Sequence, residues 1–221
     1  MTPQDVITAA RVAVQDTRLN FYRYSDADML SFVNQTLIRM AVLRPDLFSV
    51  IKEWPLTPET VMQSCPADSH RLVEIFYVVG ANAVQEVSRD MFDQSCPGWV
   101  SHGPATPVIF MRHIRNPNKF FVYPRPLTCV KVLGEYVQIP PPYEMEEDIQ
   151  VLPASYFSAL VDGTVYVAES IDNEHVNSGR AKLAQDMFLQ QLQVGLQGRV
   201  VTDTESGGLR AADDPKRPEV M

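Results

Sequence analysis

Proline is distributed unevenly along this chain, and that distribution constrains the fold more than any other feature. None of the seventeen prolines lies within residues 5–44 or 154–214, whereas thirteen lie between Pro55 and Pro153. Proline lacks a backbone N–H and clashes with the preceding turn of a helix. The two proline-free segments are therefore expected to be helical, and the segment between them to hold strands and loops.

The first proline-free segment carries two signals for the start of a helix. Both are capping boxes, in which the cap residue and the third residue after it satisfy free amide groups. The pairs are Thr2 with Asp5 and Ser25 with Asp28. Apolar residues then recur at helical spacing. We expect a first helix to about Thr17 and a second helix to Arg44, where Pro45 stops it.

The middle of the chain, from residue 47 to about 149, changes to alternating apolar residues or short β-branched runs separated by turns. We expect roughly six strands there. The clearest runs are residues 49–54, 72–79, 108–111, 120–123 and 130–139. A small antiparallel sandwich or barrel fits this pattern best.

Helical spacing returns after Pro153. Apolar residues mark a third helix from Phe157 to Ile171, and Asp172 is placed to cap a fourth. Gly195 and Gly198 are expected to end that fourth helix.

These segments together predict an α+β protein. Four short amphipathic helices need one another to bury their apolar faces. We expect residues 1–46 and 152–198 to form a four-helix bundle, with a β-sandwich or barrel-like domain inserted at residues 47–151. Residues 199–221 are polar and form a flexible C-terminal arm in this interpretation.

The net charge of −8 opposes binding to nucleic acid, and no basic cluster is visible in the sequence. The apolar and charged fractions are those of an ordinary globular protein. No apolar run approaches the ~18 residues that cross a bilayer, and the N-terminus lacks a signal-peptide pattern. We expect a protein that does not bind membranes and remains in the cytoplasm where it is made.

No pattern of residues indicates an active site or a metal centre. The chain has no nucleotide-binding or nucleophile motif, and its histidines lie outside metal-binding spacings. These are His70, His102, His113 and His175. Cys65, Cys96 and Cys129 are far apart and are expected to be free thiols. The prediction is a protein that is not an enzyme and needs no cofactor.

An acidic run leaves one enzymatic alternative open. It comprises Glu144, Glu146, Glu147 and Asp148. A peptidoglycan hydrolase needs an acid and a nucleophile facing each other across a cleft, which a contiguous run does not imply. A solvated acidic loop is the interpretation that we favour.

Residues that could contact a partner protein are better candidates for a functional role than the acidic run. Trp99 lies in a Pro-Gly loop, and Tyr123 lies close to Arg125, which are residue types enriched at protein interfaces. Exposed, Trp99 and Tyr123 would also suit a carbohydrate-binding tail component. The alternative is that both pack over the end of the β domain. In the polar arm, the candidate anchors on a partner are Leu209, Arg210, Val220 and Met221.

Several short segments, which together span nearly the whole chain, occur in an order and at spacings that are known from other proteins. They are residues 18–24 leading into 25–30 and 34–45, residues 71–75, 97–99, 116–117 with 120–126, 152–168, and 180–181. Each segment alone is weakly specific. Their order and spacing resemble the head-to-tail adaptor proteins of short-tailed and related phages.

The resemblance implies a structural virion protein at the head-tail junction, assembled in the host cytoplasm. Twelve copies would form a ring beneath the portal, with the helical bundle as ring body and the β domain facing outward or toward the tail. Leu209, Arg210, Val220 and Met221 would bind the portal, and Trp99, Tyr123 and Arg125 would face a tail nozzle or tail fibre. Genomic DNA would pass through the lumen without specific binding. Some adaptors of this broad class are credited with cell-wall hydrolysis, but no residue pair here carries that activity.

Overall fold

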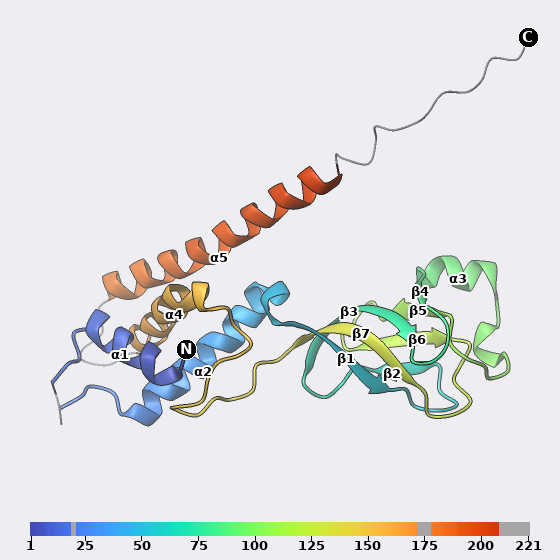
Figure 1. Cartoon of the computed structure of the whole chain (residues 1–221), viewed down its shortest axis with the longest axis horizontal. Helices are drawn as coiled ribbons and strands as arrows, with labels where there is room; N and C mark the ends of the chain where they lie inside the picture. Colours follow the sequence, from blue (N-terminus) through green and yellow to red (C-terminus); the bar gives the residue numbers. More distant parts are fainter. Residues whose placement is uncertain (19–20, 172–177, 208–221) are drawn as a thin grey trace, which may run out of the picture. The chain divides into compact units, whose positions relative to one another are not determined.

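The structure is a computed structural model that describes residues 1–18, 21–171 and 178–207, with side chains of the last helix described from Gly179 to Gln193. Within these residues the chain has five α-helices and two β-sheets, which confirms the predicted α+β class (Figure 1). It divides into two units. The first, here called the helical unit, comprises Met1–Thr36, Met145–Asp148 and the chain from Pro153 on. The second, here called the β unit, comprises Leu37–Glu144 and Ile149–Leu152. The four-helix bundle and the domain limits expected from the sequence stay predictions.

Both predicted capping boxes are present. Helix α1 (Pro3–Ala13) begins with the Asp5 N–H donating to Thr2 Oγ1 at 3.3 Å and the Thr2 N–H donating to Asp5 Oδ2 at 2.9 Å. The bond from the Thr2 N–H lowers the pKa of Asp5 below its usual value. Helix α2 (Asp26–Leu43) begins with the matching pair of Ser25 and Asp28.

Helix α1 ends earlier than the sequence predicts. The prediction placed its end at about Thr17, but the helix stops at Ala13 and Gln15 has a φ of +60°. A left-handed residue cannot continue an α-helix. The chain turns there because Arg11 is held by groups that follow the helix, which are described with the site below.

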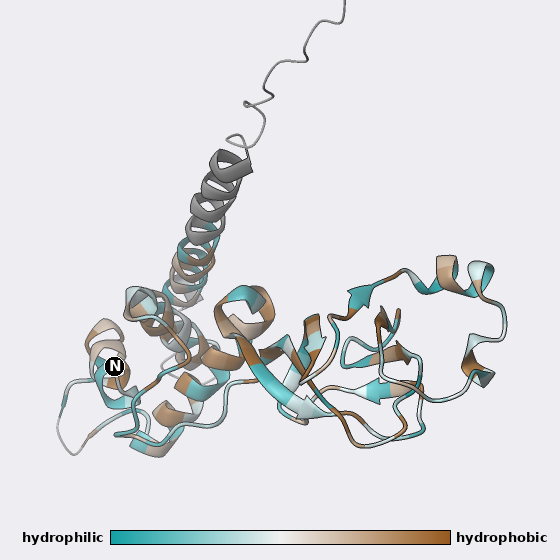
Figure 2. Cartoon of the chain, turned by 45° about the vertical axis from the view of Figure 1, so that its right-hand side comes forward, coloured by the Kyte–Doolittle hydropathy of each residue, from teal (hydrophilic) through white to brown (hydrophobic). Residues whose placement is uncertain are grey.

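Helices α4 (Phe157–Glu169) and α5 (Ser178–Gly207) carry the C-terminal part of the helical unit. A Cβ atom built on Gly163 of α4 would lie 2.4 Å from Thr36 Cγ2 and 2.9 Å from Phe188 Cε2. Helix α4 therefore packs against both α2 and α5 at a point where only glycine fits. The helices carry apolar residues, which are coloured brown along the ribbon in Figure 2. The fully buried ones include Val6 and Ala10 on α1, Met29 and Val33 on α2, and Leu160 and Ala168 on α4.

The predicted end of the last helix was wrong. Gly195 and Gly198 lie inside α5, which Figure 1 draws as one continuous helix to Gly207. A single glycine costs about 1 kcal/mol relative to alanine in a helix, which weakens a helix without ending it. No proline follows until Pro215. The Asp172 cap expected for this helix lies outside the described residues.

The β unit contains two sheets. An antiparallel three-stranded sheet has the order β1 (Ser49–Pro55), β7 (Lys131–Gln138), β3 (Ser69–Val78). A four-stranded sheet has the order β2 (Met62–Ser64), β6 (Lys119–Tyr123), β5 (Ile109–Arg112), β4 (Gln85–Glu86). All its pairs are antiparallel except β4 with β5. Short 3-10 turns lie at Pro45–Phe48, Trp99–Ser101 and, outside this unit, Ala154–Tyr156.

Five of these strands match the five clearest sequence runs, and the additional elements are short. Strands β2 and β4 have three and two residues, too few to show a period. Helix α3 (Arg89–Ser95) has seven residues and buries none of them, so it has no apolar stripe in the sequence.

One hydrophobic core serves both sheets. Its members come from all the long strands and include Trp54, Leu72, Ile75, Phe110, Phe120, Val122, Val132 and Tyr136. Trp54 and Tyr136 meet edge to face with ring centroids 5.7 Å apart. Burial, together with the negative charge of the Asp68 carboxylate that accepts its hydroxyl at 3.2 Å, raises the pKa of Tyr136 to about 12.

Candidate functional site

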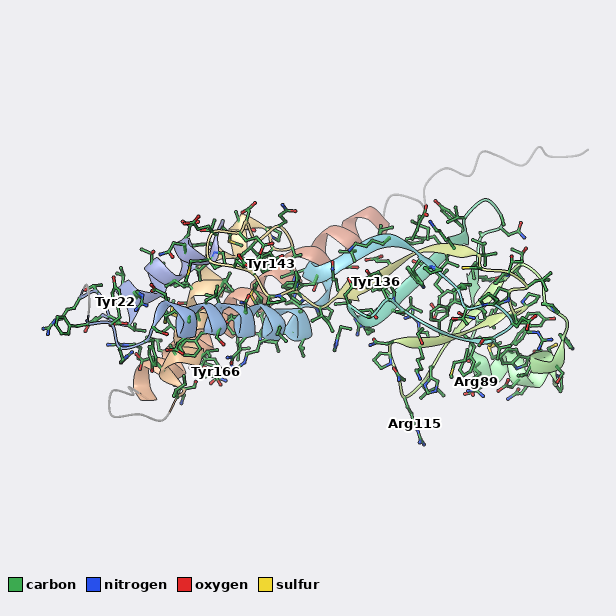
Figure 3. The ribbon with its side chains drawn as sticks, turned by 90° about the horizontal axis from the view of Figure 1, so that it is seen from below. Tyr22, Arg89, Arg115, Tyr136, Tyr143 and Tyr166 are labelled. Atoms are coloured by element: carbon green, nitrogen blue, oxygen red, sulfur yellow. The ribbon has the colours of Figure 1, made fainter. Side chains whose placement is uncertain are left out.

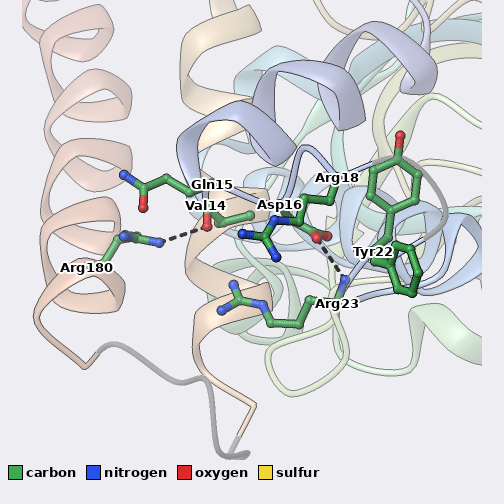
Figure 4. A pocket seen from close by; sticks show the side chains of 8 residues that line it. Val14, Gln15, Asp16, Arg18, Tyr22, Arg23 and Arg180 are labelled. Atoms are coloured by element: carbon green, nitrogen blue, oxygen red, sulfur yellow. Dashed lines mark hydrogen bonds between the residues drawn. The ribbon is translucent and has the colours of Figure 1, made fainter.

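A polar cavity of about 730 Å³ opens in the helical unit beside the segment that joins α1 to α2 (Figure 4). Its lining combines the guanidinium groups of Arg18, Arg23 and Arg180 with the rings of Phe21 and Tyr22. Phe21 is 82% exposed, although it is a large aromatic residue. We call this feature the arginine pocket. It coincides with the first of the segments, residues 18–24, on which the family resemblance rests.

Arg11 anchors one wall of the arginine pocket. Although it belongs to α1, its side chain is buried and donates to Asp16 Oδ2 at 2.7 Å, to Asp26 Oδ1 at 2.8 Å and to the Tyr24 carbonyl at 2.9 Å. The guanidinium also lies over the Tyr22 ring, 3.9 Å from the centroid. These bonds reach across the connecting segment from both sides. They explain why α1 ends at Ala13.

Glu169 anchors the other wall. Its carboxylate lies at the end of α4 and is 1% exposed. Arg23 Nη2 donates to Glu169 Oε1 at 2.7 Å, and Arg180 Nη1 from α5 approaches the same oxygen at 3.4 Å. Arg180 also donates to the Val14 carbonyl at 3.0 Å. A buried carboxylate needs such partners, because its desolvation would otherwise cost several kcal/mol.

The arrangement suits recognition rather than catalysis. Arginine and aromatic side chains at the rim of a rigid concave surface are typical of protein-protein contact sites. Guanidinium groups bind carboxylates in two-pronged geometry, and exposed rings supply apolar area. The sequence analysis did not select this site, because its members are separated by up to 166 residues. The clustering of arginine and aromatic residues between 18 and 24 was the available signal.

A second cluster gathers aromatic rings around Trp99 in the β unit. The sequence left open whether Trp99 is exposed or packs over the end of the β domain. It is 4% exposed, and its Nε1 donates to Asp93 Oδ1 at 2.7 Å. Its ring meets Phe92, Phe121 and Tyr123 at centroid distances of 5.8 to 6.3 Å. Trp99 is packed rather than exposed because α3, which has no signal in the sequence, brings Phe92 and Asp93 over the loop that carries it.

Tyr123 and Arg125 are half-buried beside this cluster. The Tyr123 hydroxyl lies 2.9 Å from His102 Nδ1, and the Arg125 carbonyl accepts the Ala105 N–H at 2.9 Å. The structure brings Tyr123 and Trp99 into contact, as the packing alternative requires. A role for these residues at a tail interface stays a prediction.

One charged feature was overlooked in the sequence. Residues 94–134 contain five Lys or Arg residues and no Asp or Glu. Three of the five lie on the hairpin of β5 and β6, at Arg112, Arg115 and Lys119. Counting acidic residues along the chain, rather than searching for runs of basic ones, would have found it.

The remaining candidates do not assemble into a site. The carboxylates of the acidic run are exposed, and that of Asp148 pairs with the N-terminal amine at 2.6 Å. Across the described ranges, no group of three or more His, Cys, Asp or Glu residues is arranged to hold a metal ion. His175, Leu209, Arg210, Val220 and Met221 lie outside these ranges. The three cysteines are free, and no helix among the described residues is long and apolar enough to cross a membrane.

An α+β chain that presents clusters of arginine and aromatic residues for contact has the makeup of an assembly protein. The family model for the SU10 adaptor protein matches residues 1–212, and the chain therefore belongs to that family. This confirms the resemblance to phage head-to-tail adaptors. Membership makes the chain a phage adaptor protein, a structural component of the virion at the head-tail junction that contacts head and tail proteins. No curated protein matches the chain.

Proposed function

We propose that twelve copies of this chain form a ring that binds the portal, extends the DNA channel and offers a docking platform for a tail nozzle or tail fibre. The observation that carries this proposal is the family match over residues 1–212. In this proposal the bundle of helices from residues 1–46 and 152–198 forms the ring body, and the domain at residues 47–151 faces outward or toward the tail. Assembly takes place in the host cytoplasm.

The charge of the chain supports a channel role. A net charge of −8 repels DNA, so a lumen lined by acidic side chains would let the genome slide without binding it. No motif or metal cluster in the described residues calls for chemistry instead. The protein acts by geometry in this proposal, completing the filled head and joining it to the tail.

The test is cryo-electron microscopy of the chain mixed with its cognate portal. Three forms are compared, the full chain and chains ending after Gly207 or Gly198. Because α5 continues to Gly207, the chain that ends after Gly207 loses only the segment that holds the proposed portal-binding residues. We expect a twelvefold ring with the full chain and none with either truncation.

A matched pair of full-length variants tests which residues of the C-terminal segment bind the portal. Replacing Leu209, Arg210, Val220 and Met221 with serine should prevent portal binding. The control variant also carries four serine substitutions in the same segment, at Ala211, Asp213, Lys216 and Glu219. It should still bind the portal. A ring that forms after truncation at Gly198 contradicts the portal-binding arm. No association of the full chain with the portal contradicts the whole proposal.

The tail-facing surface is proposed at Trp99, Tyr123 and Arg125. Since Trp99 is buried, it would position exposed neighbours, of which Met91 is 67% and Val100 is 50% exposed. The double variant Met91→Ser and Val100→Ser should keep the ring and lose retention of the tail nozzle. Ile51→Ser with Val79→Ser removes comparable exposed apolar area elsewhere in the β unit and serves as control. Equal retention by both variants contradicts this surface.

A further inference from the structure

The loop between β5 and β6 concentrates positive charge on an acidic chain. Residues 94–134 carry five positive charges and no negative one, whereas the rest of the chain has an excess of thirteen negative charges. Arg112, Arg115 and Lys119 lie on this loop or at its ends. Arg71 of β3 lines a small cavity of about 140 Å³ together with Arg112 and Lys119. We call residues 112–119 with Arg71 the basic loop.

Three of these four cations are unpaired within the β unit. Arg112 is the exception, because it pairs with Glu86 at 2.5 Å and donates to two backbone carbonyls of β3. Every residue of the β unit is described, and none of its carboxylates lies within ion-pair distance of Arg71, Arg115 or Lys119. Figure 3 shows the Arg115 side chain projecting away from the surrounding residues. The loop therefore offers cations to a partner that carries negative charge.

The backbone of the basic loop is held by side-chain hydrogen bonds. His113 Nδ1 accepts the N–H groups of Arg115 at 3.2 Å and Asn116 at 3.1 Å. Asn118 Nδ2 donates to the Ser69 carbonyl at 2.9 Å, which joins the loop to the start of β3. A loop that is held in this way loses less conformational entropy on binding than a free loop does, which favours a docking role.

The small cavity at the basic loop has room for one apolar group. Cavities of about 150 Å³ hold a benzene ring in other proteins, and the volume here is about 140 Å³. Its wall combines the apolar residues Leu72, Ile114 and Pro117 with Arg71 and Lys119 among its cations. Because Ile114 is 81% exposed, it also offers apolar area outside the cavity. An apolar side chain of a partner can therefore bind between the cations.

This apolar area favours a protein partner over DNA. The phosphate backbone of DNA is held by cations and hydrogen-bond donors, which leave Ile114 and the cavity without a role. A protein segment that combines carboxylates with an apolar side chain matches both the charge and the cavity of the basic loop.

The basic loop adjoins the surface that we propose to face the tail. The His113 imidazole stacks on the Phe121 ring, with centroids 5.7 Å apart and 17° between the two planes. The same Phe121 ring meets Trp99 edge to face at 6.2 Å. Trp99 belongs to the proposed tail-facing residues, so a chain of three rings within the β unit joins them to the loop. A tail protein on that surface is therefore also placed to contact the basic loop.

We propose that the basic loop binds an acidic segment of the tail nozzle. An apolar side chain of that segment enters the small cavity, and carboxylates on either side of it pair with Arg71, Arg115 and Lys119. Such charge-assisted hydrogen bonds are stronger than neutral ones, and opposite charges also select the correct partner. This inference rests on the proposed docking of a tail nozzle, and it adds the chemistry of the segment that docks.

Charge reversal tests this docking in assembled complexes of the chain, its cognate portal and its cognate tail nozzle. Electron microscopy counts the rings on the portal and the fraction of them that retain the nozzle. The variant Arg115→Glu with Lys119→Glu should keep the rings and lower nozzle retention about tenfold or more, because attraction becomes repulsion. Ile114→Ser leaves the charge unchanged and should lower retention by a smaller factor. Lys52→Glu with Lys131→Glu makes the same change of charge on β1 and β7 and should retain the nozzle.

Each other outcome overturns the inference. Full retention of the nozzle after charge reversal, or equal loss with the control variant, excludes this docking. Loss of the rings themselves would assign the loop to the portal or to contacts between copies. A Tm of the free chain that falls with charge reversal and not in the control would assign it to a contact within one copy.

Two further results separate DNA and the proposed function from this inference. A labelled DNA duplex that binds the ring through Arg115 and Lys119, while the nozzle is retained without them, would assign the loop to DNA. Failure of the proposed function is distinct, because the unmodified chain then forms no ring on the portal, or a ring that retains no nozzle.

Discussion

At the scale of single residues, buried charged side chains organise the arginine pocket more than buried apolar side chains do. Glu169 is inaccessible to water, yet it is an ionisable residue at the end of a helix, and two arginines from different segments converge on it. Arg11 in turn binds two aspartates beyond its own helix. Neither arrangement has a sequence pattern, because the partners meet only after the chain has folded.

Glu169→Ala should be strongly destabilising. The substitution leaves the guanidinium groups of Arg23 and Arg180 without their shared carboxylate in a buried setting, and losses of this kind amount to about 3 to 5 kcal/mol. We expect that decrease in the free energy of unfolding in urea. Glu146→Ala removes the same charge from an exposed position and should change stability by less than about 0.5 kcal/mol. Similar effects of the two substitutions would contradict the buried network.

Asp162→Asn should change the pH dependence of stability. Burial raises the pKa of Asp162, although its bond from Gln191 Nε2 at 2.8 Å acts in the opposite direction. A carboxyl whose pKa is raised by folding stabilises the protein at low pH, and that contribution is lost as the pH rises through the folded-state pKa. The asparagine variant should therefore gain stability relative to the unmodified chain between about pH 4 and pH 7.

Asp5→Asn provides the control with opposite sign. The pKa of Asp5 is lowered by the Thr2 N–H, so its contribution is present at neutral pH and lost as the pH falls through the folded-state pKa. Urea unfolding at pH 4 and pH 7 should show this variant losing more stability at pH 7. If both asparagine variants respond to pH in the same direction, the assignment for Asp162 is wrong.

At the scale of elements, helix α4 is the centre of the helical unit. It packs against α2 and α5 through Gly163, where any side chain would overlap Thr36 and Phe188. Gly163→Ala raises helix propensity by about 1 kcal/mol, but overpacking at this contact should cost more, about 1 to 3 kcal/mol. We expect net destabilisation in thermal unfolding.

A variant of Thr36 distinguishes the packing penalty of Gly163→Ala from its gain in helix propensity. Thr36→Ser removes the methyl group nearest to Gly163 and should reduce the penalty of Gly163→Ala in a double-mutant cycle. Stabilisation by Gly163→Ala alone, as expected for an exposed helix position, would show that the close contact does not exist.

At the scale of the whole molecule, net charge sets a condition for the proposed ring. Copies that each carry a net charge of −8 repel one another, and salt screens that repulsion with a screening length near 8 Å at physiological ionic strength. The yield of rings on the portal should therefore rise as NaCl is raised from about 10 mM to about 150 mM. Electron microscopy of the mixtures measures this, and a yield that falls over this range would show that attraction between opposite charges outweighs the repulsion.

The sequence by itself determined the presence of helices α1, α2, α4 and α5, the long strands and the family. Capping boxes at Thr2 and Ser25, apolar spacing and proline positions act locally, so they survive in the sequence as readable patterns. The elements that the sequence failed to show, β2, β4 and α3, are too short to display a period and owe their form to neighbours.

Only the tertiary structure decided where the interaction surfaces lie. Trp99 is buried because α3 supplies Phe92 and Asp93, and the arginine pocket exists because Glu169 and Arg180 reach the segment before α2. The loop between β5 and β6 owes its shape to bonds with β3 and His113. Burial and charge pairing depend on distances between residues far apart in the chain, and those distances are fixed by the packing of the elements rather than by any local pattern.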